Sequence, residues 1–278
     1  MAKIGRMNRL KVVNLLDFGA FLDGGLLEDI LMPRRFVPEN CKIGDELEVF
    51  VYLDSEGIPI ATNLRPKAQV DQFACLKVVD TNRIGAFLDW GMPKELLVPF
   101  SEQKVKMEKD QFYVVHVYQE KQNYRVVASS KIHKFLSDKP HQYKGGQPVS
   151  LMIWDKTDIG YTTIVDGCYS AVLFHQDIEE PVRMGMKLDG FIKRVRPDQK
   201  LDVSLKKPGF DKITVSGVGE QIINKLKENG GFLPFADRTD PETIKRVFGV
   251  SKRNFKMALG GLYKQRLVRI DEDGTHLL

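Results

Sequence analysis

The chain has 278 residues, too many for one small module, and its 42% hydrophobic and 28% charged content is ordinary for a globular protein. Forty-two Lys and Arg against 37 Asp and Glu give a net charge of +5, which permits a nucleic-acid partner without demanding one. No apolar run approaches the roughly 18 residues of a membrane span, and no apolar segment follows the basic start, so neither membrane association nor a signal peptide is expected. Three widely spaced cysteines argue against a disulfide scaffold or zinc site and fit a reducing, cytoplasmic compartment.

One five-residue pattern, Gly-Ala-Phe-Leu-Asp, occurs twice, at 19–23 and at 85–89. The surroundings repeat with it, because a similar apolar segment ending in proline follows each copy, at 29–33 and at 95–99. The two glycines are 66 residues apart. Two segments of matching length and order predict two copies of one small domain.

A third, more divergent copy follows. The segment Asp158–Thr162 stands where the first copy has Asp17–Phe21, although Gly160 lies 75 residues after Gly85 rather than 66. The stretch 133–148 accounts for the longer spacing, since its prolines, paired glycines and few aliphatic residues are typical of a linker.

Strand signals dominate the first 208 residues. Alternating patterns rich in β-branched and aromatic residues predict strands at 10–16, 46–52, 73–79, 112–118, 149–154 and 188–195. Turn signals at 54–57 and 196–199 indicate hairpins before the last strand of a repeat. Five short strands in roughly 65 residues predict a small closed barrel, because closure removes exposed strand edges.

The repeated strand can be phased, because residues two apart share one face. Ala20 and Leu22 are the natural core pair, which leaves Phe21 beside Asp23 on the solvent side, and Phe87 has the same place in the second copy. An aromatic ring on the wet face of a barrel strand is a candidate stacking platform for a nucleobase. The alternative is that these rings pack against a neighbouring domain or a long loop.

The first copy has a second ring, Phe18, three residues before Phe21. Ile84 and Ile159 occupy that place in the other copies, and Thr162 replaces the remaining ring in the third. The first repeat is therefore expected to contribute most of any stacking.

These repeats resemble the S1 RNA-binding domain, an OB-fold barrel of five strands. The resemblance rests on the segments 17–22, 42–49 and 96–102, together with 173–175 in the third copy. It implies that single-stranded RNA binds through two aromatics, a histidine and basic residues near the last strand. No copy has the full set, which suggests binding shared across domains. The implied site residues are Phe18, Phe21 and Phe87 for the aromatics, His175 for the histidine (where Pro33 and Pro99 stand in the other copies), and Arg125 and Lys200 for the basic position.

From about residue 215 the periodicity becomes helical. Three helices and a final hairpin with an acidic turn at 271–273 predict a winged helix, whose third helix can enter a major groove. The supporting signals are an apolar stripe at Ile222, Ile223 and Leu226 ended by Asn229–Gly231, a capped start at Asp240–Pro241, and a third helix capped by Ser251 with Phe255, Leu259, Leu262 and Tyr263 at core spacing.

The segment 244–269 contains eight Lys and Arg residues and no Asp or Glu. Lys252, Arg253 and Lys256 can share the exposed face of the third helix and contact phosphate. The alternative is an ordinary solvated face or a protein-docking role, since the acidic wing would repel phosphate.

The order of parts and the segment Ser137–Tyr143 resemble the bacterial conserved virulence factor B family. This resemblance implies RNA binding and post-transcriptional regulation of gene expression. The chain is expected to be mainly β with a C-terminal α+β domain: S1-like OB barrels at 1–66, 67–132 and 149–209, a linker at 133–148 and a winged helix at 213–278.

Motifs of enzymes are missing from the sequence, which has no HExxH, GxSxG or phosphate-binding P-loop. No catalytic residue, metal ligand or cofactor is therefore expected. The leading hypothesis is a non-catalytic protein that binds single-stranded RNA. The alternatives are a protein-interaction scaffold with eroded S1 domains, or a regulator that binds duplex nucleic acid through the winged helix.

Overall fold

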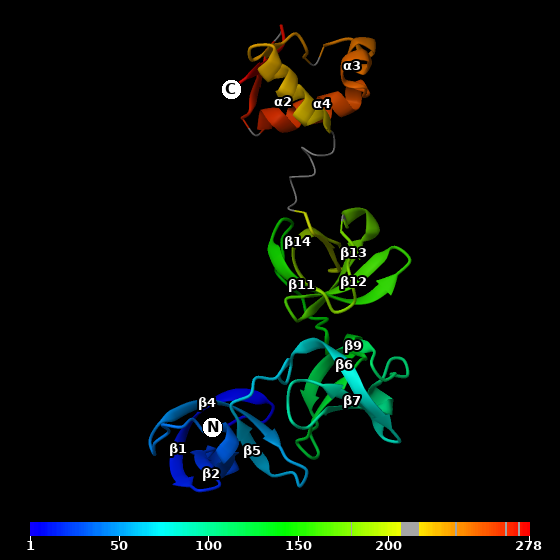
Figure 1. The fold of residues 1–278 in the computed structure, drawn as a ribbon. Helices are drawn as coiled ribbons and strands as arrows, with labels where there is room; N and C mark the ends of the chain where they lie inside the picture. The colour runs from blue at the N-terminus through cyan, green and yellow to red at the C-terminus, as the bar shows by residue number, and fades with distance from the viewer. Residues whose placement is uncertain (179, 207–216, 237, 265, 272) are drawn as a thin grey trace. The chain divides into compact units, whose positions relative to one another are not determined.

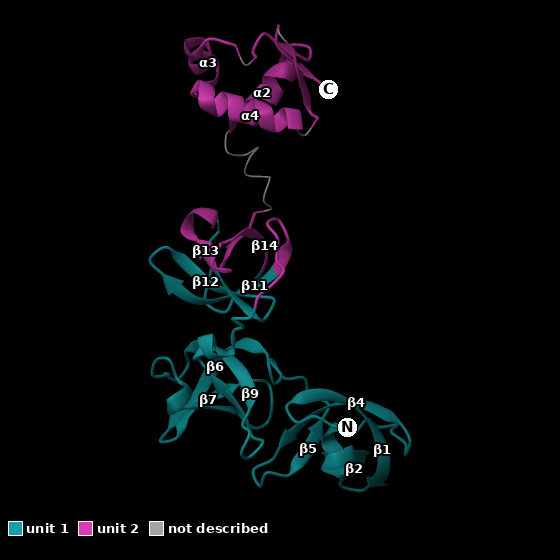
Figure 2. Ribbon diagram, turned by 180° about the vertical axis from the view of Figure 1, so that it is seen from behind, with its two compact units in different colours: residues 1–139, 150–171, 180–188 teal, residues 140–149, 172–179, 189–278 magenta. Residues whose placement is uncertain are grey.

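The computed structural model describes residues 1–178, 180–206, 217–236, 238–264, 266–271 and 273–278 (Figure 1). Its contacts group into two compact units, residues 1–139, 150–171 and 180–188 in one and residues 140–149, 172–179 and 189–278 in the other (Figure 2). The division passes through the third barrel. The expected boundary between this barrel and the winged helix, at 209–213, lies outside the described residues.

The first repeat is a closed five-stranded barrel with the strand order β1-β2-β3-β5-β4. A parallel pairing of Leu31 with Ile60 joins β3 to β5 and closes it. Ala20 and Leu22 are fully buried in its core, as the phasing predicted. The elements are β1 (Arg6–Leu16), β2 (Gly19–Asp23), η1 (Gly25–Leu27), β3 (Asp29–Pro33), η2 (Arg34–Phe36), β4 (Glu46–Leu53) and β5 (Pro59–Thr62).

The second repeat has the same strand neighbours, in the order β10-β9-β6-β7-β8. Its end strands β8 and β10 lie side by side without the ladder that closes the first barrel. The elements are β6 (Phe73–Asn82), β7 (Gly85–Asp89), β8 (Leu96–Pro99), η3 (Phe100–Glu102), β9 (Phe112–Gln119), β10 (Val126–Ser129) and η4 (Ile132–Phe135).

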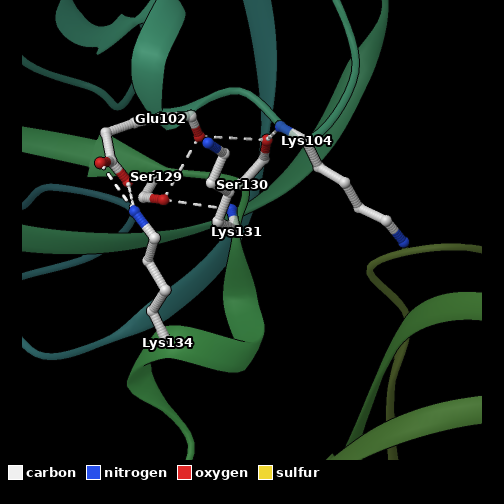
Figure 3. Close-up of polar contacts among 6 residues, drawn as sticks. All are labelled: Glu102, Lys104, Ser129, Ser130, Lys131 and Lys134. Carbon is white, nitrogen blue, oxygen red and sulfur yellow. Dashed lines mark hydrogen bonds and ion pairs between the residues drawn. The ribbon is translucent and has the colours of Figure 1, made fainter.

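A polar cluster fastens the end of this second barrel (Figure 3). The backbone carbonyl of Glu102 accepts hydrogen bonds from Ser130 N at 3.0 Å and from Ser129 Oγ at 3.3 Å. Ser130 Oγ accepts from Lys104 N at 2.8 Å, and Lys134 Nζ lies 2.9 Å from the Glu102 carboxylate. These contacts connect η3 to the end of β10. In the first repeat, the parallel pairing of β3 with β5 makes the equivalent connection.

The third repeat is again a closed barrel, β11-β12-β13-β15-β14, so the prediction of three five-stranded barrels is confirmed. The expected linker 133–148 overlaps η4, whose Phe135 stacks on His116 at 4.1 Å between ring centroids. The elements are β11 (Pro148–Thr157), β12 (Gly160–Val165), β13 (Tyr169–Phe174), η5 (His175–Asp177), β14 (Lys187–Val195) and β15 (Leu201–Ser204).

The repeated glycine marks the same turn in every barrel. Gly19, Gly85 and Gly160 each open a second strand, and each pairs with the last residue of the first strand. A Cβ at Gly19 would lie 2.3 Å from the carbonyl oxygen of Met32, so the second and third strands approach too closely for a side chain.

The first two barrels share a hydrophobic core. A strand with one wet face alternates in burial, yet Val49 through Tyr52 in β4 are all buried. The outward-facing ring of Phe50 packs edge-on against Trp90 of the second repeat, 5.5 Å between centroids at 81°. Val70 N of the second repeat donates to Gly5 O of the first repeat at 2.9 Å.

The C-terminal domain has the predicted three helices and hairpin, with α4 packed against α2 and α3 (Figure 1). Asp240 caps α3 by accepting from Thr243 N at 3.0 Å. Tyr263 was wrongly predicted in the core; it is exposed because Phe255, Ala258, Leu259 and Leu262 already fill the buried face of α4. The elements are α2 (Gly217–Glu228), β16 (Phe232–Leu233), α3 (Pro241–Phe248), α4 (Lys252–Lys264), β17 (Val268–Ile270) and β18 (Thr275–Leu277), in the sheet order β16-β18-β17.

No helix among the described residues is both long enough and apolar enough to cross a membrane.

Candidate nucleic-acid interface

The first repeat presents two phenylalanine rings on its outer surface. Phe18, in the turn between β1 and β2, is 57% exposed, and Phe21 on β2 is half-buried. The rings meet edge-to-face, 6.1 Å between centroids at 88°. Such contact holds both rings in place, so a base that stacks on Phe18 meets a surface that needs little ordering.

The second repeat brings two of the predicted site residues together. Phe87 pairs with Asp80 as Phe21 pairs with Asn14, so the two rings hold the same barrel position. Arg125 directly precedes β10. Phe87 and Arg125 line one cavity of about 300 Å³, together with Tyr52, Leu53, Ile84, Trp90, Lys94, Glu95, Leu97, Val126 and Val127.

Two cations meet at this cavity. Lys94 Nζ donates to the backbone carbonyl of Asp54 at 2.8 Å, and burial together with the positive charge of Arg125 lowers the pKa of Lys94. The Arg125 guanidinium has no ion pair within the described part of the chain. An anion placed here would reduce the repulsion between the two side chains.

The third repeat has the same barrel but different side chains on its outer surface. Thr162 pairs with Asp155, just as Phe21 and Phe87 pair with the equivalent residues of their first strands. The third repeat therefore has no ring at this barrel position. Lys200 directly precedes β15, as Arg125 precedes β10, and its Nζ lies 3.5 Å from Asp198.

His175 does not hold the position that the resemblance gave it. Pro33, Pro99 and Phe174 each end a third strand and precede a 3-10 helix. His175 is the first residue of η5, equivalent to the first residues of η2 and η3, so the expected alignment of the histidine was one residue too late. The shift follows from the strand ending at Phe174, and the side chain of His175 is exposed there.

The basic residues of the winged helix lie at the start of α4. Arg253 and Lys256 are exposed and Lys252 is half-buried, while Phe255 and Leu259 turn toward the core. The three cations therefore share the first turns of the helix on its outer side.

Acidic side chains gather at the other end of this domain. Asp271, Asp273 and His276 offer ligand atoms within 4.8 Å of one another, but Arg269 Nε already pairs with Asp271 at 2.9 Å. This wing therefore repels phosphate less than its sequence suggested, and Glu272 lies outside the described residues.

The sequence did not predict the first-repeat side of the cavity, nor Lys94 of the second repeat. Tyr52 and Leu53 end β4, and Lys94 lies in the loop between β7 and β8, away from any motif. The available signal was the run of four apolar residues at 49–52, which is too uniform for a strand with one wet face.

Comparison with known proteins supports this arrangement. A model of the S1 domain matches residues 4–64, and a model of the CvfB-like winged helix domain matches residues 220–277. Conserved virulence factor B of Staphylococcus saprophyticus is 27% identical over 282 residues, covering 96% of this chain and 92% of that protein. The protein of the same name from Staphylococcus aureus USA300 is 26% identical over 277 residues with the same coverage.

A solved structure is also similar. A multidomain protein with nucleic acid binding domains from Streptococcus pneumoniae TIGR4 aligns with 99% of this chain and 98% of its own, at 23% identity and a TM-score of 0.42. With matches at both ends of the chain and relatives along nearly all of it, the resemblance drawn from the sequence is confirmed: the chain is similar to the conserved virulence factor B proteins over nearly its whole length.

Proposed function

We propose that this protein binds single-stranded RNA through the outer faces of its S1 barrels and acts in post-transcriptional regulation in the cytoplasm. The S1 and winged-helix domains are nucleic-acid-binding types. The observation that supports the proposal best is the meeting of Phe87 and Arg125 at one cavity. They come from opposite ends of the repeat sequence, and they supply the stacking surface and the cation that an unpaired nucleotide requires.

The physical basis is sequence-tolerant. Stacking on Phe18, Phe21 and Phe87 is worth about 1–3 kcal/mol per base, because every base has a π face. Cations such as Arg125 and Lys200 add phosphate contacts whose strength falls with salt. The protein therefore holds unpaired RNA with modest base preference and strong salt dependence.

Anisotropy of a fluorescent 12-nucleotide RNA tests the proposal. Phe18→Ala and Phe21→Ala together weaken binding at least tenfold. Phe112→Ala, which removes an exposed ring on β9 outside the cavity, leaves the affinity unchanged. Failure of the unaltered protein to bind oligo(U) or oligo(A) at low salt would contradict the proposal and favour a protein-interaction scaffold.

The exposed cations of α4 support a second candidate, contact with duplex nucleic acid through the winged helix. Replacing Lys252, Arg253 and Lys256 with Gln in the full chain separates the two. Loss of duplex binding with RNA binding retained assigns α4 to duplex contact. Loss of RNA binding alone adds α4 to the RNA surface.

A further inference from the structure

The cavity beside Phe87 has walls from two repeats. Phe87, Leu97 and Arg125 belong to the second repeat. Tyr52 and Leu53, at the end of β4, belong to the first. An S1 barrel taken alone would leave the Phe87 face open, whereas here the first repeat covers one side of it.

The first-repeat wall is held in place by a chain of contacts. The Tyr52 ring stacks on Phe50 at 6.2 Å and 18°, and Phe50 packs against Trp90. Trp90 Nε1 donates to Lys94 O at 2.6 Å, and Lys94 Nζ returns to the first repeat at Asp54 O. These rings are almost completely buried, so the two walls are packed directly against each other.

The lining matches one nucleotide in size and chemistry. A volume of about 300 Å³ is at the small end of ligand pockets, enough for one base with its sugar and too small for a base pair. Aromatic and aliphatic side chains form most of the wall, and Lys94 and Arg125 are positioned for a phosphate. Glu95 is the one acidic residue of the lining, and its carboxylate can accept a hydrogen bond from a base amino group.

We infer that this cavity is a single-nucleotide slot formed jointly by the first and second repeats. One unpaired base enters between Phe87 and the end of β4, and its phosphate lies against Arg125 and Lys94. The inference rests on the proposed RNA binding and adds that the second repeat binds only with the first repeat in place.

The decisive variant fills the slot from the first-repeat side. Leu53→Trp leaves every residue of the second repeat intact, so it weakens binding only if the bound base lies beside the end of β4. We expect Leu53→Trp to weaken binding of the oligo(U) or oligo(A) 12-mer at least tenfold, as Phe87→Ala does. The double variant should bind no more weakly than either single variant. Ile43→Trp, at an exposed apolar residue of the same barrel outside the slot, is the matched control and leaves the affinity unchanged.

Crosslinking provides a readout that does not depend on folding of the variants. An oligonucleotide with one 4-thiouridine, irradiated with the unaltered protein, is expected to crosslink both within 46–53 and within 85–97. Crosslinks within 85–97 alone would overturn the shared slot.

The failures are distinguishable. If Phe18→Ala with Phe21→Ala weakens binding while Leu53→Trp has no effect, the shared slot is overturned and RNA binding stands. If the unaltered protein binds neither 12-mer, the proposed function fails and the slot fails with it.

Discussion

The second and third repeats are the same barrel with different outer surfaces. Their first two strands pair in the same register, but the position that Phe87 holds beside a two-walled cavity in the second repeat is held by Thr162 in the third. A second outward position behaves similarly, since Phe50, His116 and Phe191 pair with the equivalent residue of the last strand in the three repeats. Inward residues fix the barrel, while outward residues can change without disturbing it.

What covers this second position differs from repeat to repeat. Phe50 lies under Trp90 of the second repeat, and His116 lies between Phe73 and Phe135. Phe191 is only half-buried. The first two repeats thus use one surface position to pack against the chain that follows.

Phe50→Ala is expected to have the largest effect, because it removes a fully buried ring from the shared core and costs about 4 kcal/mol. Urea unfolding, monitored by hydrogen exchange of the amides in β4 and β7, measures the loss of stability in both repeats. Phe191→Ala, at the equivalent position, is expected to cost much less. Equal losses would show that Phe50, at the contact between the first two repeats, contributes no more stability than Phe191 on the surface of the third barrel.

Acidic pH should lower the stability of the second repeat. Burial lowers the pKa of His116 from 6.5 to about 4, against a small opposite effect of Asp71, and Nδ1 has no hydrogen-bond partner within the described chain. The folded state therefore binds fewer protons than the unfolded state between these values. Stability is full above pH 6.5 and falls by about 3 kcal/mol as the pH drops to 4.

Urea midpoints between pH 7.5 and pH 4 check this dependence. His116→Phe keeps a ring between its aromatic neighbours and removes this part of the pH loss. His133→Phe, at an exposed histidine on η4, is the control and keeps it. A His116→Phe variant with unchanged pH dependence would place the titration elsewhere.

Phe87→Thr gives the second repeat the residue of the third. The loss of one stacking surface is expected to weaken RNA binding by about 2 kcal/mol, roughly thirtyfold. Phe112→Thr makes the same chemical change outside the cavity, and anisotropy should show no effect. Equal effects of the two substitutions would mean that Phe87 acts through stability and not through contact.

The repeats, their strands and the inward phasing of Ala20 and Leu22 were predictable, because alternation along a strand is local information. The position of His175 was not, since one residue of difference in a strand end shifts an alignment. The places of Tyr52 and Lys94 in the cavity could not be predicted either. They meet only because Phe50 and Trp90 pack two repeats together, and contacts between domains leave no fixed spacing in a sequence.

The reverse substitution, Thr162→Phe, should have the smallest effect. It restores a ring at the register of Phe21 and Phe87, and Lys200 already stands where Arg125 stands. A ring on an open face gains about 1 kcal/mol, the lower end of the stacking range. Anisotropy should therefore show a gain of roughly fivefold or less. A gain as large as the loss in Phe87→Thr would mean that the first-repeat wall adds nothing to the Phe87 site, because one ring and one cation on a bare barrel would then suffice.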